Sequence, residues 1–201
     1  IMNNTDLYIS YQLGNNTNGV ISDIYGGEYE ELGTYVSSNS DGSIIAIGTP
    51  KYNRTQLTAD TGNIKVYQYS HSETFWLQLG ETIHGEQANE NLGPVKLNND
   101  GNIIITSSYN YDNGSSADTG KVMAYEFKTI SEGEWDDGNI ISFNLSDGSP
   151  IIATTSNTYS STTKYWVQKG DALYGAAGDK LGGVLDINGT GTVIAVTSSS
   201  N

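Results

Sequence analysis

The residues of this chain that are able to do chemistry are mainly its carboxylates, together with two histidines. His71 lies in a polar loop, and His84 stands where other segments carry Tyr25 and Tyr174, so the two imidazoles show no metal-ligand spacing. No Gly-x-Ser-x-Gly sequence is present to supply a nucleophile. Any two of the 23 Asp and Glu residues could be imagined as a glycosidase pair, but sequence does not set the separation of about 5–10 Å that this reaction needs. The sequence therefore predicts no catalytic residue.

One recurring turn partly matches an enzyme signature. Thr58-x-Asp60-x-Gly62 and Ser116-x-Asp118-x-Gly120 are similar to the Asp-box of sialidases, but Ile64-Lys65 and Val122-Met123 stand where that box ends in an aromatic residue. The Asp-box is itself a turn stabiliser of propellers. We therefore interpret this motif as an Asp side chain that holds a hairpin turn.

The elements that must position these residues recur with a period near sixty residues. Ala59-Asp60-Thr61-Gly62 returns as Ala117-Asp118-Thr119-Gly120, 58 positions later. Asp41-Gly42 returns as Asp100-Gly101, and Trp76 as Trp135, both 59 positions later. A fixed period of this length is typical of propellers and solenoids, whose units bury their apolar faces only by stacking.

Each unit begins with two apolar strands that flank an Asp-Gly or Asn-Gly turn, because these residues tolerate the positive φ of a hairpin. The second strand of each hairpin is almost entirely apolar, which predicts burial on both faces. A third strand follows in the first two units, and a fourth strand carries a Gln and a Gly two positions apart. The predicted units cover approximately residues 32–85, 92–135, 139–175 and 181–201, the third being degenerate, with residues 7–14 as a closing outer strand.

The combined pattern resembles FG-GAP-like β-propeller repeats. It comprises Gly-Glu, Leu-Gly-x-x-Val, Asp-Gly-x-Ile-Ile-Ala-Ile-Gly, Gly-x-Ile-x-Val-Tyr and Trp-x-Gln-Leu-Gly. It is similar to the blades of integrin α-subunits, and most similar to repeat proteins of marine bacteria and large algal viruses. The likeness covers Leu7 to Ser198, least well between Asp136 and Thr163.

The resemblance implies an all-β fold, a β-propeller of antiparallel blades. We count roughly four blades, partly degenerate, which is fewer than the family usually has. Two arrangements stay open. Leu7–Gly14 closes a small ring against the last hairpin, or the chain is a segment of a larger propeller or array.

Calcium-binding members of that family carry an Asp-x-Asp-x-Asp-Gly loop. The corresponding turns here, Asn39-Ser40-Asp41-Gly42 and Asn98-Asn99-Asp100-Gly101, have one carboxylate in place of three. Calcium takes about six to eight oxygen ligands, so these turns would need carbonyls or water as well. The sequence argues against calcium there, and no metal ligand or cofactor is predicted.

The composition excludes several classes of partner. The 201 residues carry a net charge of −14, which repels nucleic-acid phosphates and anionic membrane surfaces. No apolar run approaches the ~20 residues of a membrane span. Cysteine is absent, so disulfides and thiolate metal sites are excluded. We interpret the acidity as a solubility feature, with cation or partner binding as the alternative.

Binding residues are expected on one face of the fold. In a four-stranded meander, the loops between the second and third strands lie on the same face as the connections to the next unit. Loops on a rigid scaffold often carry binding, and Tyr with Asn is a versatile contact set. The predicted ligand-binding residues are Tyr52, Asn53, Arg54, Tyr109, Tyr111 and Asp112 from the loops, with Glu28, Glu86, Glu90 and Asp179 from the connections.

The preferred functional hypothesis is a non-enzymatic module for adhesion, recognition or assembly. It places the chain on an extracellular, cell or virion surface, with a protein or glycan as partner and self-association as an option. The alternatives are a carbohydrate-binding or polysaccharide-hydrolysing propeller, and a structural spacer in a filament. A close carboxylate pair with perturbed pKa in a concave pocket would favour the hydrolase. End-to-end contacts between successive copies would favour the spacer.

Overall fold

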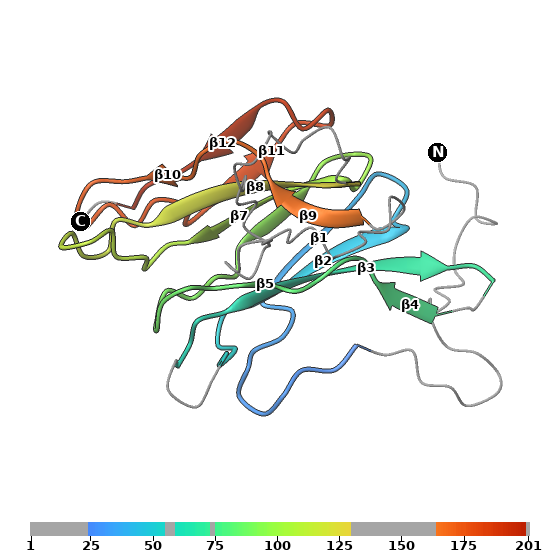
Figure 1. Ribbon diagram of the computed structural model, residues 1–201, viewed down its shortest axis with the longest axis horizontal. Helices are drawn as coiled ribbons and strands as arrows, with labels where there is room; N and C mark the ends of the chain where they lie inside the picture. The colour runs from blue at the N-terminus through green and yellow to red at the C-terminus, as the bar shows by residue number, and fades with distance from the viewer. Residues whose placement is uncertain (1–23, 55–58, 73–74, 130–163, 200–201) are drawn as a thin grey trace, which may run out of the picture.

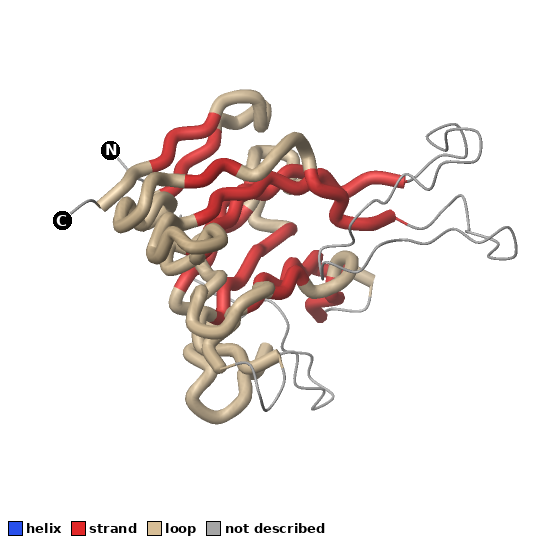
Figure 2. Tube along the Cα trace, turned by 60° about the vertical axis from the view of Figure 1, so that its left-hand side comes forward, coloured by secondary structure: helices blue, strands red, loops and turns tan. Residues whose placement is uncertain are grey.

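The computed structural model describes residues 24–54, 59–72, 75–129 and 164–199. Every regular element in these residues is a strand, and none of them is helical (Figure 2). The strands pair antiparallel, and the few parallel contacts are isolated bridges. The predicted all-β class is therefore confirmed. No sheet closes on itself within the described part of the chain.

The first sheet orders its strands as they follow in the sequence, β1-β2-β3-β4, and the short strand β5 also pairs with β3. Its strands are β1 Tyr35–Ser38, β2 Ile44–Thr49, β3 Asn63–Ser70, β4 Phe75–Gln78 and β5 Ile83–His84. The predicted first hairpin and the strands that follow it are thus present.

The second sheet repeats this order, with β6-β7-β8 paired in sequence and both β9 and β10 paired with β8. Its strands are β6 Val95–Leu97, β7 Ile103–Ser108, β8 Lys121–Thr129, β9 Lys164–Gln168 and β10 Leu173–Tyr174. The third sheet consists of β11 Leu185–Ile187 and β12 Ile194–Val196, which repeat the first hairpin alone. Figure 1 shows the second sheet between the other two.

The fourth strand of the second sheet comes from later in the chain than the sequence predicted. Trp166 of β9 lies opposite Phe127 of β8, as Trp76 of β4 lies opposite Tyr69 of β3. Trp166, rather than Trp135, is therefore the counterpart of Trp76. β9 falls within the predicted third unit, but it completes the second sheet because it pairs with β8. The predicted hairpin of the third unit, residues 140–153, and the predicted strand 7–14 lie outside the described residues.

An asparagine at the same position holds each of the three hairpin turns. The Oδ1 atoms of Asn39, Asn98 and Asn188 each accept the N–H of the residue five positions later, at 2.9 Å. The turns also join the sheets, because the N–H of Ser40 donates to the Asn99 carbonyl and that of Asn99 to the Gly189 carbonyl, both at 3.0 Å. The predicted turns at Asp41-Gly42 and Asp100-Gly101 are confirmed, and the third sheet also begins with a hairpin, although its positive φ falls on Gly191 and not on the predicted Gly189. These turns connect successive sheets.

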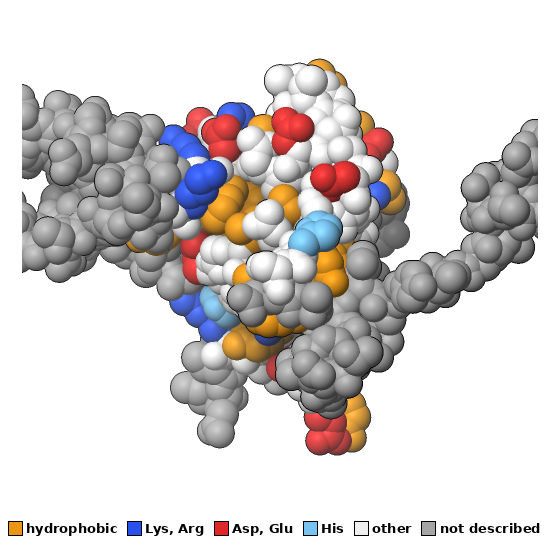
Figure 3. Space-filling model, turned by 90° about the vertical axis from the view of Figure 1, so that its right-hand side faces the viewer, with side chains coloured by type: hydrophobic (Ala, Val, Ile, Leu, Met, Phe, Trp, Pro, Cys, Tyr) orange, Lys and Arg blue, Asp and Glu red, His pale blue; other side chains and the backbone are white. Residues whose placement is uncertain are grey.

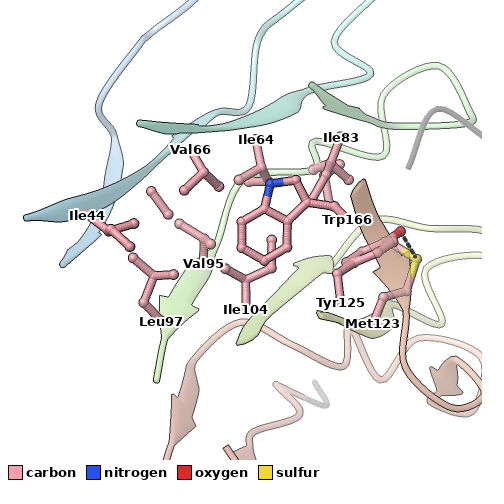
Figure 4. Packing of buried hydrophobic residues seen from close by; sticks show 12 residues of the cluster. Ile44, Ile64, Val66, Ile83, Val95, Leu97, Ile104, Met123, Tyr125 and Trp166 are labelled. Atoms are coloured by element: carbon pink, nitrogen blue, oxygen red, sulfur yellow. Dashed lines mark hydrogen bonds between the residues drawn. The ribbon is translucent and has the colours of Figure 1, made fainter. Parts of the chain in front are cut away.

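The core lies between the sheets. Figure 4 shows Ile64, Val66 and Ile83 of the first sheet facing Ile104 of the second, with the Trp166 ring between them. A smaller cluster joins the second and third sheets. Trp166 is fully buried and therefore packs these two sheets together.

The second strands differ in burial, contrary to the prediction that all are covered on both faces. β2 and β7 are almost entirely buried, whereas β12 is mostly exposed. The difference is clear at one equivalent position, where Ile44 is 9% exposed, Ile103 7% and Val193 62%. In the described residues, no third strand and no further sheet covers β12.

Candidate functional site

The Ala-Asp-Thr-Gly motif docks the connection that leads into the next sheet. The carbonyls of Ala59, Asp60 and Thr61 accept the N–H groups of Asn89, Asn91 and Leu92 at 2.8–3.0 Å. The second copy makes the same three contacts: the carbonyls of Ala117, Asp118 and Thr119 accept from Gly178, Lys180 and Leu181 at 2.9–3.0 Å. The motif therefore recurs because each copy holds two sheets together through its backbone.

The turn in this motif is held differently from the prediction. Asp60 and Asp118 have φ of 49° and 52°, and their N–H groups donate to the side-chain oxygens of Asn53 and Asp112 at 2.7 Å. The Asp60 and Asp118 carboxylates instead lie near ammonium groups, with 3.9 Å to Lys51 and 3.6 Å to Lys180. Asn53 and Asp112, predicted to bind a ligand, thus use a side-chain oxygen to support the loop.

Three of the predicted residues, Tyr111, Glu86 and Glu90, lie around a buried lysine. The Lys121 ammonium lies 2.7 Å from Oε1 of Glu86 and 4.7 Å from the centre of the Tyr111 ring, which contacts Tyr174 at 5.8 Å. We call Glu86, Glu90, Tyr111, Lys121 and Tyr174 the Lys121 cluster. A buried ammonium needs such a counter-charge and an aromatic face, since it has lost its water.

Glu90 is the buried carboxylate of this cluster, with 2% of its surface exposed. Its Oε1 accepts the N–H of Glu86 at 2.6 Å, while Oε2 has no hydrogen-bond partner. Burial raises the pKa of Glu90 to about 7, the nearby Glu86 charge adds to the rise, and the Lys121 ammonium and the Glu86 N–H oppose it. The neutral acid is therefore the form that the fold accommodates.

Replacing Glu90 by glutamine is expected to stabilise the fold at pH 8 by about 2 kcal/mol, and to change little at pH 5. The pKa of Glu90 is higher in the folded state than its ordinary value of 4.5, so the native chain loses stability as pH rises from about 4.5 through 7. Urea unfolding at the two pH values measures this, with the exposed Glu28→Gln as control. A parallel pH dependence in E90Q and the native chain would contradict the prediction.

Tyr111 also belongs to this environment. Burial, and then the charge of Glu86, raise the pKa of Tyr111 to about 12, so its phenol remains protonated. Asp112 is joined to the same region by Gln87. The Gln87 side chain donates to the Asp112 carbonyl at 3.0 Å and accepts the Asp112 N–H at 3.2 Å. The structure thus brings Glu86, Glu90, Tyr111 and Asp112 together.

The remaining predicted residues lie in separate places. The Tyr52 ring contacts His84 at 5.6 Å, and Tyr109 lies beside Tyr35. Asp179 Oδ2 accepts the N–H of Ala176 at 2.8 Å and supports its own turn. Arg54 and Glu28 are exposed. The predicted set is therefore one cluster and several independent loop positions.

Sequence reasoning missed three features. The side chain of Lys121 contacts Glu86, and that of Gln87 contacts the loop residue Asp112, so both tie the second sheet to the connection that follows β5. The one sequence signal for this was that Lys121 occupies the position of Asn63 in the first unit. The third feature is a hollow of about 280 Å³ between the first strands of the three sheets. We call it the axial hollow, and it is lined by Thr34, Tyr35, Val36, Pro94, Val95, Lys96, Gly183, Val184 and Leu185.

In the part of the chain that the structure describes, no three His, Asp or Glu side chains lie together so that they could hold a metal ion. No helix there has the length and apolar character needed to cross a membrane. Figure 3 shows hydrophobic, acidic and basic side chains interspersed on one face, without a large field of a single sign.

Neither a family model nor any curated protein matches this chain.

Proposed function

We propose that this chain is a non-enzymatic module for recognition or assembly on an extracellular, cell or virion surface, built as part of an FG-GAP-like β-propeller. The observation that carries the proposal is the uncovered second strand of the third sheet. β2 and β7 each pair with a third strand over six positions, whereas β12 pairs only with β11 among the described residues. An open edge of this kind is a template for a strand of a partner.

The repeated contacts indicate which partner would fit. The turn of each sheet donates one N–H to the turn of the next, from Ser40 to Asn99 and from Asn99 to Gly189. The next donor in this series is the N–H of Gly189. A sheet of the same repeat would accept it and would cover the exposed Val193. The partner is therefore a chain that carries the Gly-x-Ile-x-Val-Tyr third strand, and a second copy of this chain meets that description.

The arrangement of the sheets supports the propeller. Successive sheets follow one contact scheme, and their first strands converge on the axial hollow. Sheets that share flanks around a common axis have this property, and further sheets would extend the series. Leu7–Gly14 remains the proposed closing strand, in competition with strands from another copy.

The hydrolase alternative has less support. Glu86 and Glu90 are the acidic pair whose neighbourhood most resembles that of a glycosidase, because Glu90 has a raised pKa. Its side chain is nevertheless buried, and the Lys121 ammonium is bound to Glu86. The Glu86 side chain is exposed, but a sugar would not reach the buried carboxylate of Glu90, so the two cannot act on it as a pair.

Substituting lysines for Val193 and Ala195 is expected to weaken self-association at least tenfold, because both residues are exposed on or beside β12. Sedimentation velocity over a concentration series measures the effect. A peptide with the sequence of residues 63–70 should compete with association of the native chain, because it supplies a third strand. Leu77→Lys, at an exposed position of β4, is the matched control. A native chain that stays monomeric throughout and does not bind the peptide would overturn the proposal.

A further inference from the structure

The axial hollow has a composition that the proposed assembly role does not explain. Its walls come from β1, β6 and β11 and the residues just before them, so three segments far apart in sequence form one space. Its volume of about 280 Å³ is close to the lower end of the range for small-molecule sites. It is separate from the Lys121 cluster, with which it shares no residue.

The hollow carries an unpaired positive charge. Among the described residues that line it, Lys96 alone is charged, and it is half-buried. Within the described residues its ammonium has neither an ion pair nor a hydrogen bond. Ion pairs are made there by Lys51, Lys121, Lys169 and Lys180. In a chain of net charge −14, a half-buried cation without a carboxylate partner indicates that an anion from outside would bind favourably.

The rest of the lining is mainly apolar. Val36 is 56% exposed and Val184 64%, while Val95 and Leu185 are buried. Two exposed valines beside one hollow lose contact with water when an apolar group enters, which contributes roughly 25 cal/mol per Å² of buried area. The hollow therefore suits a molecule that is apolar along its length.

Tyr35 adds an aromatic ring to the lining. Burial, and then the neighbouring Tyr109, raise the pKa of Tyr35, so the phenol stays protonated. Because the Tyr35 hydroxyl is already hydrogen-bonded to Tyr109, Tyr35 presents its ring to an apolar chain. Lys96 and Tyr35 come from adjacent sheets, so both can serve one ligand.

We propose that the axial hollow binds a small ligand with an apolar body and one carboxylate, which pairs with the ammonium of Lys96. Val36 and Val184 contact the apolar body, and the carboxylate gives the Lys96 ammonium the counter-charge that it lacks among the described residues. Neutral and cationic molecules of the same length lack this pairing. The site therefore selects by charge first and by length second.

The probe is octanoate, compared with octanol and octylammonium, in titrations followed by amide chemical shifts of the isotope-labelled full chain. Octanoate is expected to shift the resonances of Val36, Lys96 and Val184 saturably, and to bind at least tenfold more tightly than the other two. Lys96→Gln should weaken octanoate binding at least tenfold. Lys65→Gln, which removes the same charge from half-buried Lys65 of β3, should leave it unchanged.

A second variant tests the volume. Val184→Trp places a large ring in the hollow and should abolish octanoate binding while the spectrum remains dispersed. Three results would overturn the proposal: no saturable shifts in the native chain, equal affinity for octanoate and octanol, or octanoate binding that is the same in K96Q or V184W as in the native chain.

Discussion

Replacing Trp166 by alanine is expected to lower the free energy of unfolding by about 3–5 kcal/mol. The side chain is fully buried between the first two sheets, and its ring packs on Phe127 at a centroid distance of 5.0 Å. Its indole N–H also donates to the Leu79 carbonyl at 2.8 Å, so the variant leaves that acceptor without its donor. Domains of this kind have only about 5–15 kcal/mol in total, so the loss is a large fraction.

Trp76→Ala is the matched comparison, because Trp76 has the equivalent place in β4 but is only half-buried. Its loss is expected to cost clearly less. Urea unfolding followed by circular dichroism measures both, since removing a tryptophan alters the fluorescence signal. Equal losses for the two variants would contradict the assignment of Trp166 as the residue that packs the first two sheets together.

Gly120→Ala is expected to cost about 2–5 kcal/mol, from two causes that act together. Gly120 has φ of 73°, where a side chain costs about 1–2 kcal/mol. A Cβ there would also meet the backbone of Leu181, which enters the third sheet and bridges to Gly120. Overpacking of this kind adds about 1–3 kcal/mol, because backbone cannot move aside as a flexible side chain does.

Gly114→Ala separates these causes. Gly114 has φ of 63° in the same loop, but a Cβ there would meet no atom within 4 Å. Its expected cost is therefore the conformational part alone, about 1–2 kcal/mol. Thermal and urea unfolding of both variants give the difference. If Gly120→Ala were no worse than Gly114→Ala, close packing of the motif against Leu181 would be disproved.

Local patterns predicted much of the fold. The Asn/Asp-Gly turns with apolar flanks located β1–β2, β6–β7 and β11–β12, because a hairpin is determined by neighbouring residues. The third strands β3 and β8 were also located from their own sequence. The recurring Gln-x-Gly has a local cause too, since the side chains of Gln78 and Gln168 donate to the carbonyls of Gly80 and Gly170.

The pairing of β9 was not predictable in the same way. Trp135 keeps the 59-residue spacing from Trp76, whereas Trp166 does not. The structure nevertheless pairs Trp166 with Phe127, after a long stretch of chain between β8 and β9. Spacing is a property of the chain, whereas pairing depends on which strand fits the edge of β8. A sequence period therefore fails wherever the connection between paired strands changes length.

The candidate site shows the same division. Loop tyrosines and carboxylates were identified from the sequence, but the roles of Asn53 and Asp112 follow from N–H groups several residues away. The burial of Glu90 depends on the second sheet lying against its connection, which brings Lys121 close. Residue type indicated which polar groups were available, and packing determined which of them bond to the protein's own backbone instead of remaining free for a ligand.

By itself, the sequence determined the all-β class, the repeated turns and the strands beside them, because these depend on backbone preferences and on apolar patterns over a few residues. The tertiary structure alone decided that β9 joins the second sheet, that β12 stays uncovered in the described residues, and that Lys96 and Val184 line one hollow. These features arise from contacts between sheets, whose free energy depends on surfaces that meet only when distant segments have folded.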